Sequence, residues 1–488
     1  MFYQSTRSSL RASDLEAVLQ GLAPDGGLYI DPEIRSRAFD WEKCLALDEL
    51  GMTEMILSSL LPGFENMGAL VEKAYRGKFD DERLSPVVKC GDAFVMELFH
   101  GPTSAFKDVA LSMLPQLITQ AAKQLDVKEK IVILTATSGD TGKAALEGFH
   151  DVDGTGIIVF YPHGGVSAVQ RAQMVTQKGG NVRVCALEGN FDDCQRGVKA
   201  AFGDGSLKLE GVRLSSANSI NIGRLAPQIV YYFSAYAQLI AAGEIEMGDK
   251  VDYIVPTGNF GDILAGYYAK LMGLPVGRLV CAANENNVLF DFIESGLYDS
   301  RREFLRTSSP SMDILVSSNL ERLLFLASDG NADAVKSWME ALSREGHYRI
   351  DDATLANIRA HISSGYADEV RVEKTIGKVW QENRYLCDPH TAVAWTVMED
   401  YRSSAAYSGA KCVVLSTASP YKFPAAVLRA IGGDMSGDEF EQMERLSALT
   451  GTALPKNLAS LRELEELHLD VIPRDDLIDY VGKALNEL

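Results

Sequence analysis

One lysine in this sequence lies where its side chain could do chemistry. Lys107 follows Phe106 in ELFHGPTSAFKDVAL (residues 97–111), and the apolar residues after it have helical spacing: Val109, Leu111, Leu114, Leu117, Ile118 and Ala121. The partial positive charge at a helix N-terminus and the apolar ring of Phe106 both lower the pKa of an ammonium group. A lysine with a lowered pKa is suited to Schiff-base chemistry. The alternative is an ordinary solvated lysine.

A turn between two glycines follows a predicted strand near the middle of the chain, in PTGNFGDILAGYYAK. Gly258 and Gly261 enclose Asn259 and Phe260, directly after the strand and directly before a helix. Two glycines allow a sharp turn that exposes backbone N–H groups, and the helix start adds partial positive charge. Such a turn can bind a phosphate without a basic side chain. A tight turn with glycines for geometry alone explains this stretch equally well.

A hydroxyl-rich turn, TATSGDTGKAA (residues 135–145), lies between another predicted strand and helix. The nucleotide-binding pattern G-x-x-x-x-G-K-[ST] fails here at two positions, because the chain has Thr137 and Ala144 there. The hydroxyls of Thr137, Ser138 and Thr141, together with backbone N–H groups at a helix start, are suited to binding a carboxylate. Simple N-capping of the helix is the alternative.

The loop SSANSINIGRLAPQ (residues 215–228) brings polar side chains together around one arginine. Asn218, Ser219 and Arg224 are near one another in it, and arginine suits bidentate contact with an oxyanion. A surface loop with a solvated arginine is the alternative.

Two later segments complete the set of polar turns. A predicted strand ends in STASPYKF (residues 416–423), with hydroxyls at Ser416, Thr417 and Ser419. In CDPHTAVAW, Pro389 suits the first turn of a helix, and we expect His390 beside it to be structural.

Composition limits what this chain can do. Its 488 residues predict two to four domains, and 46% hydrophobic with 23% charged residues is typical of a globular protein with a sizeable core. The net charge of -20 argues against nucleic-acid binding. Seven cysteines without a CxxC pair argue against a zinc site or a disulfide framework and favour a reducing cytosol. No secretory signal or membrane-spanning run is evident, so we expect a cytoplasmic location.

The polar turns follow apolar, β-branched runs that are typical of buried parallel strands, and helices follow the turns. Strand, turn and helix in succession predict an α/β protein with its ligand at the carboxyl ends of the strands. We expect a mainly helical N-terminal region (1–92), a smaller α/β domain with Lys107 and the carboxylate turn (93–215), a larger α/β domain with the phosphate turn (216–430) and a helical insertion at about 286–375, and a C-terminal helical cap (431–488).

The motifs together resemble one enzyme family. FHGPTSAFKD, TATSGDTGKAA, NSINIGRL, PTGNFGD, DPHTAVA and STASPYKF occur in this order and resemble the threonine synthases, in particular their longer bacterial and fungal branch, which GLAPDGGLYI (residues 21–30) also resembles. The resemblance covers residues 20–430 and implies the tryptophan-synthase-β-like fold: two open, twisted α/β domains with pyridoxal phosphate between them.

The resemblance implies a role for each motif. Lys107 would bind pyridoxal phosphate covalently and act as the base. The cofactor phosphate would lie on Gly258, Asn259, Phe260 and Gly261, with Asp262 in the same motif, and Thr417 would face the pyridine nitrogen. The substrate would be held at its carboxylate by the turn with Thr137, Ser138, Asp140 and Thr141, and at its phosphate by Asn218, Ser219 and Arg224.

Two positions depart from related patterns. Relatives in this fold often have Asn, in contact with the cofactor phenolate oxygen, where this chain has Asp140. Because a carboxylate would repel a phenolate, we expect Asp140 to turn away, toward the following backbone or Lys143. The family often has His where this chain has Ser419, which leaves any acid–base or ring-packing role there in doubt but not the role of Thr417.

The implied reaction converts O-phospho-L-homoserine and water to L-threonine and phosphate, by γ-elimination and β-addition of water. We expect a monomer or homodimer without a nucleic-acid, membrane or metal partner. One alternative is a related pyridoxal-phosphate lyase or dehydratase, against which Arg224 argues weakly, because a dehydratase needs no substrate phosphate site. The other is a catalytically silent protein that binds a phosphorylated ligand, against which Lys107 argues.

Overall fold

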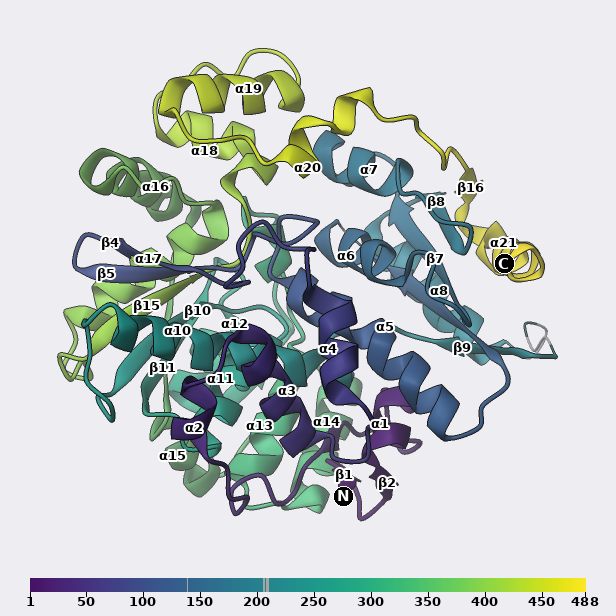
Figure 1. Cartoon of the computed structure of the whole chain (residues 1–488), viewed down its shortest axis with the longest axis horizontal. Coiled ribbons are helices and arrows are strands. Elements are labelled where there is room, and N and C mark those ends of the chain that lie inside the picture. The colour runs from purple at the N-terminus through teal and green to yellow at the C-terminus, as the bar shows by residue number, and fades with distance from the viewer. Residues whose placement is uncertain (138, 205–206, 208–209) are drawn as a thin grey trace.

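The computed structural model describes residues 1–137, 139–204, 207 and 210–488. Its two main β-sheets have six and five strands (Figure 1). The larger sheet has the strand order β14-β11-β10-β15-β5-β4, and only β4 runs antiparallel to its neighbour. Its six strands are β4 (Val87–Cys90), β5 (Ala93–Glu97), β10 (Val251–Pro256), β11 (Val276–Ala283), β14 (Ile362–Tyr366) and β15 (Lys411–Ser416).

The smaller sheet has five parallel strands in the order β16-β8-β7-β6-β9. They are β6 (Lys130–Ala136), β7 (Thr155–Pro162), β8 (Val182–Glu188), β9 (Val212–Ser215) and β16 (Val471–Pro473). All eight residues of β7 are buried, which explains its continuous apolar sequence. Helices α6 (Asp140–Phe149) and α8 (Phe191–Gly203) pack on this sheet, and α7 (Ala168–Val175) and α21 (Leu477–Glu487) pack on those helices.

Helix α5 (Lys107–Gln124) begins at Lys107 itself, which confirms the predicted position of this lysine at a helix N-terminus. The first twelve residues of α5 are all buried. The reason is that α5 packs against helices from three parts of the chain: α6, α1 (Asp14–Gln20) with α4 (Met67–Tyr75), and α9 (Ile222–Leu225). The lysine is therefore enclosed by the fold and cannot extend into water as a surface lysine does.

The N-terminal region contains four helices, as expected, and also a small antiparallel sheet of β1 (Phe2–Ser5), β2 (Arg11–Ser13) and β3 (Tyr29–Ile30). Its other helices are α2 (Trp41–Leu45) and α3 (Glu49–Leu60). Helix α1 begins with a capping box in which Ser13 and Glu16 satisfy each other's backbone N–H groups.

The inserted region is mainly helical, with α12 (Val288–Ser295), α13 (Leu320–Ala327), α14 (Ala332–Glu345), α15 (Asp352–Arg359) and α16 (Glu369–Asn383). It also holds the two-stranded sheet of β12 (Leu297–Asp299) and β13 (His347–Arg349), and its strand β14 forms one edge of the larger sheet. The remaining helices are α10 (Ile229–Ala241), α11 (Gly261–Leu271), α17 (Pro389–Arg402), α18 (Pro424–Ala430), α19 (Glu439–Thr450) and α20 (Lys456–Ala459).

The C-terminal segment returns to the smaller sheet. In Figure 1 the yellow chain runs from α19 past α20 and α7 to β16, which pairs in parallel with β8. The region predicted as a helical cap thus contributes a strand as well as helices.

The predicted domain boundaries remain a proposal, and three strands fall differently from them. Strand β4, which the prediction placed in the mainly helical N-terminal region, pairs with β5 in the larger sheet. Strand β5, which the prediction assigned to the smaller domain, pairs with β15 in the larger sheet. Strand β16, which the prediction placed in the cap, lies in the smaller sheet. The largest hydrophobic cluster includes residues of both sheets, such as Ile133 and Val255.

In the part of the chain that the structure describes, no helix is both long and apolar enough to cross a membrane.

Candidate active site

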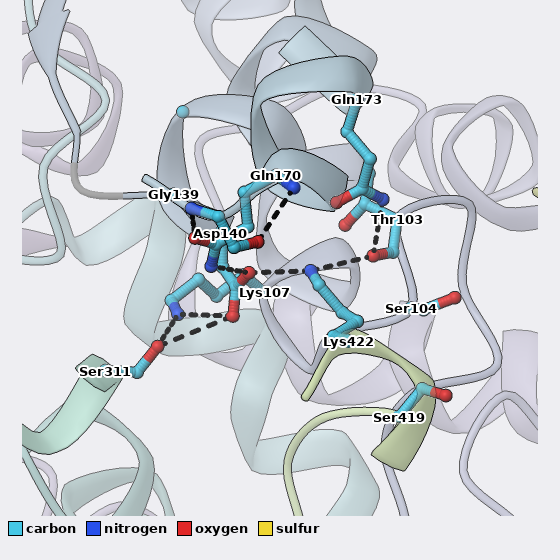
Figure 2. Close-up of polar contacts among 12 residues, drawn as sticks. Thr103, Ser104, Lys107, Gly139, Asp140, Gln170, Gln173, Ser311, Ser419 and Lys422 are labelled. Carbon is cyan, nitrogen blue, oxygen red and sulfur yellow. Dashed lines mark hydrogen bonds and ion pairs between the residues drawn. The ribbon is translucent and has the colours of Figure 1, made fainter. Parts of the chain in front are cut away.

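The side chain of Lys107 lies in a buried polar cluster. Its Nζ donates a hydrogen bond to Ser311 Oγ (3.0 Å) and lies 3.9 Å from Asp140 Oδ2 (Figure 2). Burial lowers the pKa of Lys107 to about 8; the Asp140 carboxylate opposes this effect, whereas Lys422 and Arg224 add to it. An amine with such a pKa is partly unprotonated near neutral pH, as a nucleophile or base must be.

Asp140 points into this cluster, and the prediction that it turns away, toward the following backbone or Lys143, is wrong. Its Oδ1 accepts from Lys422 Nζ at 2.6 Å and from Gln170 Nε2 at 3.2 Å. Lys143 instead pairs with Glu147 at 3.1 Å. Burial opposes the charge of Asp140, but the ammonium groups of Lys422 and Lys107 outweigh burial and hold the pKa of this carboxyl well below its usual range. The attraction of two buried cations thus decides where Asp140 points.

The glycine turn has the features expected of a phosphate-binding loop. Phe260 has a φ of 62°, and α11 begins at the next residue. A Cβ atom added to Gly258 would lie 2.7 Å from the carbonyl oxygen of Ser311, so this position requires glycine. Among the described residues, no group accepts a hydrogen bond from the backbone N–H of Gly258, Asn259 or Phe260. These donors, with the start of α11, are available for an anion.

Asp262, which we predicted to bind the cofactor with this turn, is directed elsewhere. Its Oδ1 accepts hydrogen bonds from the hydroxyls of Tyr231 and Tyr232, the latter at 3.1 Å. Burial raises the pKa of Asp262 to about 7, and the two hydroxyl donors only partly offset this. The contacts of Asp262 therefore hold α11 against α10.

Arg224 is a buried cation that no acid neutralises in the described part of the chain. Its Nη1 donates to the carbonyl oxygen of Ala217 (2.8 Å), and its buried Nε has no partner among the described residues. Burial lowers the pKa of Arg224 to about 10. Asn221, from the same motif, caps α9 by accepting from the N–H of Gly223 (2.8 Å). A buried guanidinium with a free donor is prepared for an incoming anion.

A segment that sequence reasoning assigned to the helical insertion joins the two anion-binding loops. Asn319 Nδ2 donates to the carbonyl oxygens of Ser219 (3.2 Å) and Asn259 (3.1 Å). The guanidinium of Arg322 donates to Asn319 Oδ1 and to the carbonyl oxygen of Ile220, both at 2.5 Å. The 215–228 loop and the glycine turn are therefore held at a fixed separation.

The predicted carboxylate turn is only partly available for a ligand. Thr137 Oγ1 accepts from the backbone N–H groups of Gly139 (3.0 Å) and Gly142 (2.9 Å), so its hydroxyl holds the turn itself. The hydroxyl of Thr141 makes no hydrogen bond within the described part of the chain and is half-buried. Ser138 lies outside the described residues.

Of the hydroxyls of Ser416, Thr417 and Ser419, at and just after the end of β15, only that of Thr417 makes no hydrogen bond to a described residue. Ser416 Oγ pairs with Thr391 Oγ1 (2.8 Å), and Ser419 Oγ accepts from the N–H of Tyr421 (3.4 Å). In Figure 2 the Ser419 side chain points away from the lysine cluster. Thr417 is buried and is the hydroxyl best placed to meet a ligand.

Backbone hydrogen bonds join the segment after β15 to the segment before α5. The N–H of Phe106 donates to the carbonyl oxygen of Thr417 (2.9 Å), and the N–H of Ser419 to that of Ser104 (3.1 Å). Lys107, which follows Phe106, is thus positioned directly from the end of a strand in the larger sheet.

His390, expected to be structural, supports Ser311. The backbone N–H of Ser311 donates to His390 Nε2 (3.2 Å), while His390 Nδ1 lies 2.5 Å from Asp388 Oδ2. Nε2 accepts in this arrangement, so Nδ1 carries the proton that is donated to the carboxylate. These contacts orient Ser311, whose hydroxyl accepts the hydrogen bond from Lys107 Nζ.

Sequence reasoning missed three residues of this site: Ser311, Asn319 and Lys422. Lys422 lies within the motif STASPYKF, and a lysine six residues beyond a hydroxyl-rich strand end was a signal that could have found it. Ser311 and Asn319 reach the site only through contacts with distant segments, and nothing in their local sequence indicates this.

The residues present fit pyridoxal phosphate. Lys107 supplies an amine of lowered pKa, the glycine turn supplies unused N–H donors, and Thr417 supplies an unused hydroxyl. No group of three or more His, Cys, Asp or Glu side chains within the described ranges could hold a metal ion. The fold and this site define a pyridoxal-phosphate-dependent enzyme, and the chain matches the family described as "Pyridoxal-phosphate dependent enzyme" over residues 80–418.

The comparisons narrow the class further. Residues 391–479 match the family described as "Threonine synthase, C-terminal". Threonine synthase of Pseudomonas aeruginosa is 40% identical over 483 residues, which cover 96% of this chain and 98% of that protein. The structure of threonine synthase from Brucella melitensis with bound pyridoxal phosphate is 39% identical, with a TM-score of 0.88 over 99% of both chains. The yeast threonine synthase structure is 34% identical, with a TM-score of 0.89 over 100% of this chain and 98% of that one.

This chain belongs to the threonine synthase family. The predicted fold class, the cofactor pyridoxal phosphate and the threonine synthase activity of a pyridoxal-phosphate-dependent lyase are confirmed by these comparisons.

Proposed function

We propose that this enzyme forms L-threonine and phosphate from O-phospho-L-homoserine and water, with each predicted residue in the role given below. The observation that carries the substrate assignment is Arg224, a buried guanidinium without an acidic partner among the described residues. It lies near enough to Lys107 to lower that amine's pKa. A phosphorylated substrate would supply the anion that this cation lacks.

The cofactor would be held at its two ends by different loops. The N–H groups of Gly258, Asn259, Phe260 and Gly261 would bind its phosphate, and the Thr417 hydroxyl would meet its ring nitrogen. Pyridoxal phosphate, when bound, withdraws electrons from the carbon atoms of an attached amino acid. Asp262 would contribute by holding α11 in place, because its carboxylate is occupied by two tyrosine hydroxyls.

The substrate would lie between Arg224 and the start of α6. Arg224, with Asn218 and Ser219 from the same loop, would bind the leaving phosphate. The Thr141 hydroxyl and the N-terminus of α6 would bind the carboxylate, while Thr137 would shape that turn. Lys107 would then remove the proton at the α-carbon and a proton at the β-carbon, and would return a proton at the γ-carbon after phosphate leaves. The hydroxyl of water would add at the β-carbon, and a proton would return to the α-carbon to complete threonine.

Lys107 can do this because its pKa, about 8, allows it to accept and release protons near neutral pH. Ser311, at 3.0 Å from Nζ, would orient the free amine. A dehydratase of the same cofactor class would need Lys107 but no buried cation for a substrate phosphate, so Arg224 favours the phosphorylated substrate.

A product assay tests this proposal. Purified enzyme given O-phospho-L-homoserine should form L-threonine and inorganic phosphate in equal amounts, with little 2-oxo acid. A 2-oxo acid as the main product would identify a dehydratase or lyase, and binding without turnover would identify a silent phospho-ligand protein. Either outcome contradicts the proposal.

Cellular location and assembly are also part of the proposal. All seven cysteines are buried free thiols, which supports a reducing cytoplasm. The assembly would be a monomer or a homodimer, which light scattering of the purified enzyme distinguishes.

A further inference from the structure

Asp140 lies between two buried lysines and contacts them unequally. Its Oδ1 is 2.6 Å from Lys422 Nζ, whereas its Oδ2 is 3.9 Å from Lys107 Nζ and 3.5 Å from Ser311 Oγ (Figure 2). Lys422 therefore makes the close ion pair, and Lys107 hydrogen-bonds to a neutral hydroxyl instead of the acid.

Lys422 has no route to water. Its side chain is 0% exposed, and its Nζ donates to the carbonyl oxygen of Thr103 (3.1 Å) in addition to Asp140. It ends the short helix η4 (Pro420–Lys422) after β15 of the larger sheet, whereas Asp140 begins α6 beside the smaller sheet. A buried ammonium is costly unless paired, and this pair joins the segment after β15 to the start of α6.

We propose that Lys422 is a positioning residue that acts through Asp140: by occupying this carboxylate, it leaves Lys107 free to react as a neutral amine. If Lys422 were absent, Asp140 would have Lys107 as its remaining ammonium partner. The carboxylate would then stabilise the protonated form of Lys107. Lys107 Nζ must be neutral to attack the cofactor aldehyde.

The charges around the cluster agree with this role. Three cations (Lys107, Lys422 and Arg224) face two acids, Asp140 and Asp108. Asp108, on the same helix as Lys107, is occupied by the N–H and hydroxyl of Thr103. His390 also lies near Asp140, and with its Nε2 accepting from the N–H of Ser311 it adds no positive charge to the cluster. The surplus of positive charge favours proton loss, and of the two lysines Lys107 has the weaker contact with an acid. Arg224 has no acidic partner among the described residues, but its pKa of about 10 stays above that of Lys107.

Substitutions at the two positions should have opposite effects on Lys107. Lys422→Met removes a repelling cation and frees Asp140, and both changes raise the pKa of Lys107. Asp140→Asn removes the attracting acid and lowers it. The double variant Asp140→Asn/Lys422→Met removes a neutral pair and should return the pKa toward that of the parent.

The measurement is covalent loading of the cofactor-free full chain by pyridoxal phosphate across pH 6–10, trapped with borohydride and mapped to Lys107. Only the neutral amine reacts, so the loading rate rises with pH through the pKa of Lys107. At pH 7 we expect loading of Lys422→Met to be at least about tenfold slower, which corresponds to a midpoint one pH unit higher. Lys422→Arg, which keeps the charge, should retain the parental midpoint.

A midpoint for Lys422→Met equal to that of the parent would overturn the proposal. If that variant does not fold, Asp140→Asn and the double variant are compared, and identical midpoints for those two would overturn it equally.

The proposal rests on Lys107 as the cofactor-binding residue. Absence of label on Lys107 in the parent contradicts the proposed function, whereas label on Lys107 with unshifted midpoints contradicts only the role of Lys422.

Discussion

The side-chain amide of Asn319 donates to the backbone carbonyl of Asn259 at 3.1 Å, beside the backbone N–H of Asn319, which donates to the same oxygen at 3.0 Å. The inserted region thus holds the glycine turn by two bonds from one residue. The same amide also donates to Ser219 in the loop that carries Arg224. One side chain thus contacts both anion-binding loops.

Replacing this side chain should weaken both loops together. Asn319→Ala removes these two hydrogen bonds and the Oδ1 that accepts from Arg322, but keeps the backbone bond to Asn259. Each lost bond is worth about 0.5–1.5 kcal/mol, so we expect the Kd for pyridoxal phosphate and the inhibition constant of inorganic phosphate both to rise roughly tenfold. Absorbance titration and inhibition assays measure them. Ser318→Ala is the matched control, because its contacts with the same loops are weaker, at 3.3 and 3.4 Å. A change in only one constant would show that Asn319 does not couple the loops.

Arg224 should matter for substrate and little for cofactor. Arg224→Ala should reduce kcat/KM by a factor that corresponds to roughly 2–5 kcal/mol of activation free energy, the scale of losing a buried charged partner. Cofactor affinity should stay nearly unchanged. Arg213→Ala, at an exposed arginine of β9 that pairs with Glu129, is the control and should leave kcat/KM nearly unchanged. If Arg224→Ala loses the cofactor but turns over substrate normally when reloaded, the two phosphate sites have been assigned the wrong way round.

Thr417 should control the protonation of the cofactor ring nitrogen. A hydroxyl can donate to an unprotonated nitrogen, whereas a carboxylate requires a protonated one. Thr417→Asp should therefore change the absorbance spectrum of the enzyme with substrate, slow threonine formation and increase abortive products. Thr417→Ser keeps the donor and should stay within about tenfold of the parent, that is about 1.4 kcal/mol. An unchanged spectrum and product ratio for Thr417→Asp would mean that Thr417 does not meet the nitrogen.

Asp262 should make the stability of the enzyme depend on pH. Its ordinary pKa of 3.8 is raised to about 7 in the folded protein, mainly by burial, so the folded state retains a proton that the unfolded state loses. Its contribution to stability is complete below about pH 4, falls as pH rises and is lost above about pH 7. Urea unfolding between pH 4.5 and 8 should show this fall, which we expect to reach about 2–4 kcal/mol.

Asp262→Asn should abolish that part of the pH dependence and change cofactor affinity little, because its side chain faces Tyr231 and Tyr232. An equal slope in the parent and the variant would contradict the pKa assignment. A large loss of cofactor affinity would instead support the original prediction that Asp262 belongs to the cofactor site.

The sequence alone was enough to predict the local units of this enzyme. The start of α5 at Lys107, the glycine turn before α11 and the hydroxyl turn before α6 were all predictable. Each depends on interactions among about a dozen consecutive residues: a buried strand, a turn that needs glycine or a hydroxyl, and an amphipathic helix. The family resemblance rested on these same turns, which is why cofactor and activity could be predicted with them.

Only the tertiary structure decided how these units meet. Strand β5 joins the larger sheet because its partner β15 lies more than three hundred residues later in the chain, and sequence pattern does not specify such pairing. Lys422 and Thr103 are separated by 319 positions, and Lys107 and Ser311 by 204. The direction of Asp140 was predicted wrongly for the same reason. A buried carboxylate turns toward the nearest cations, and here the closest of them, Lys422, comes from a distant segment that folding brings beside it.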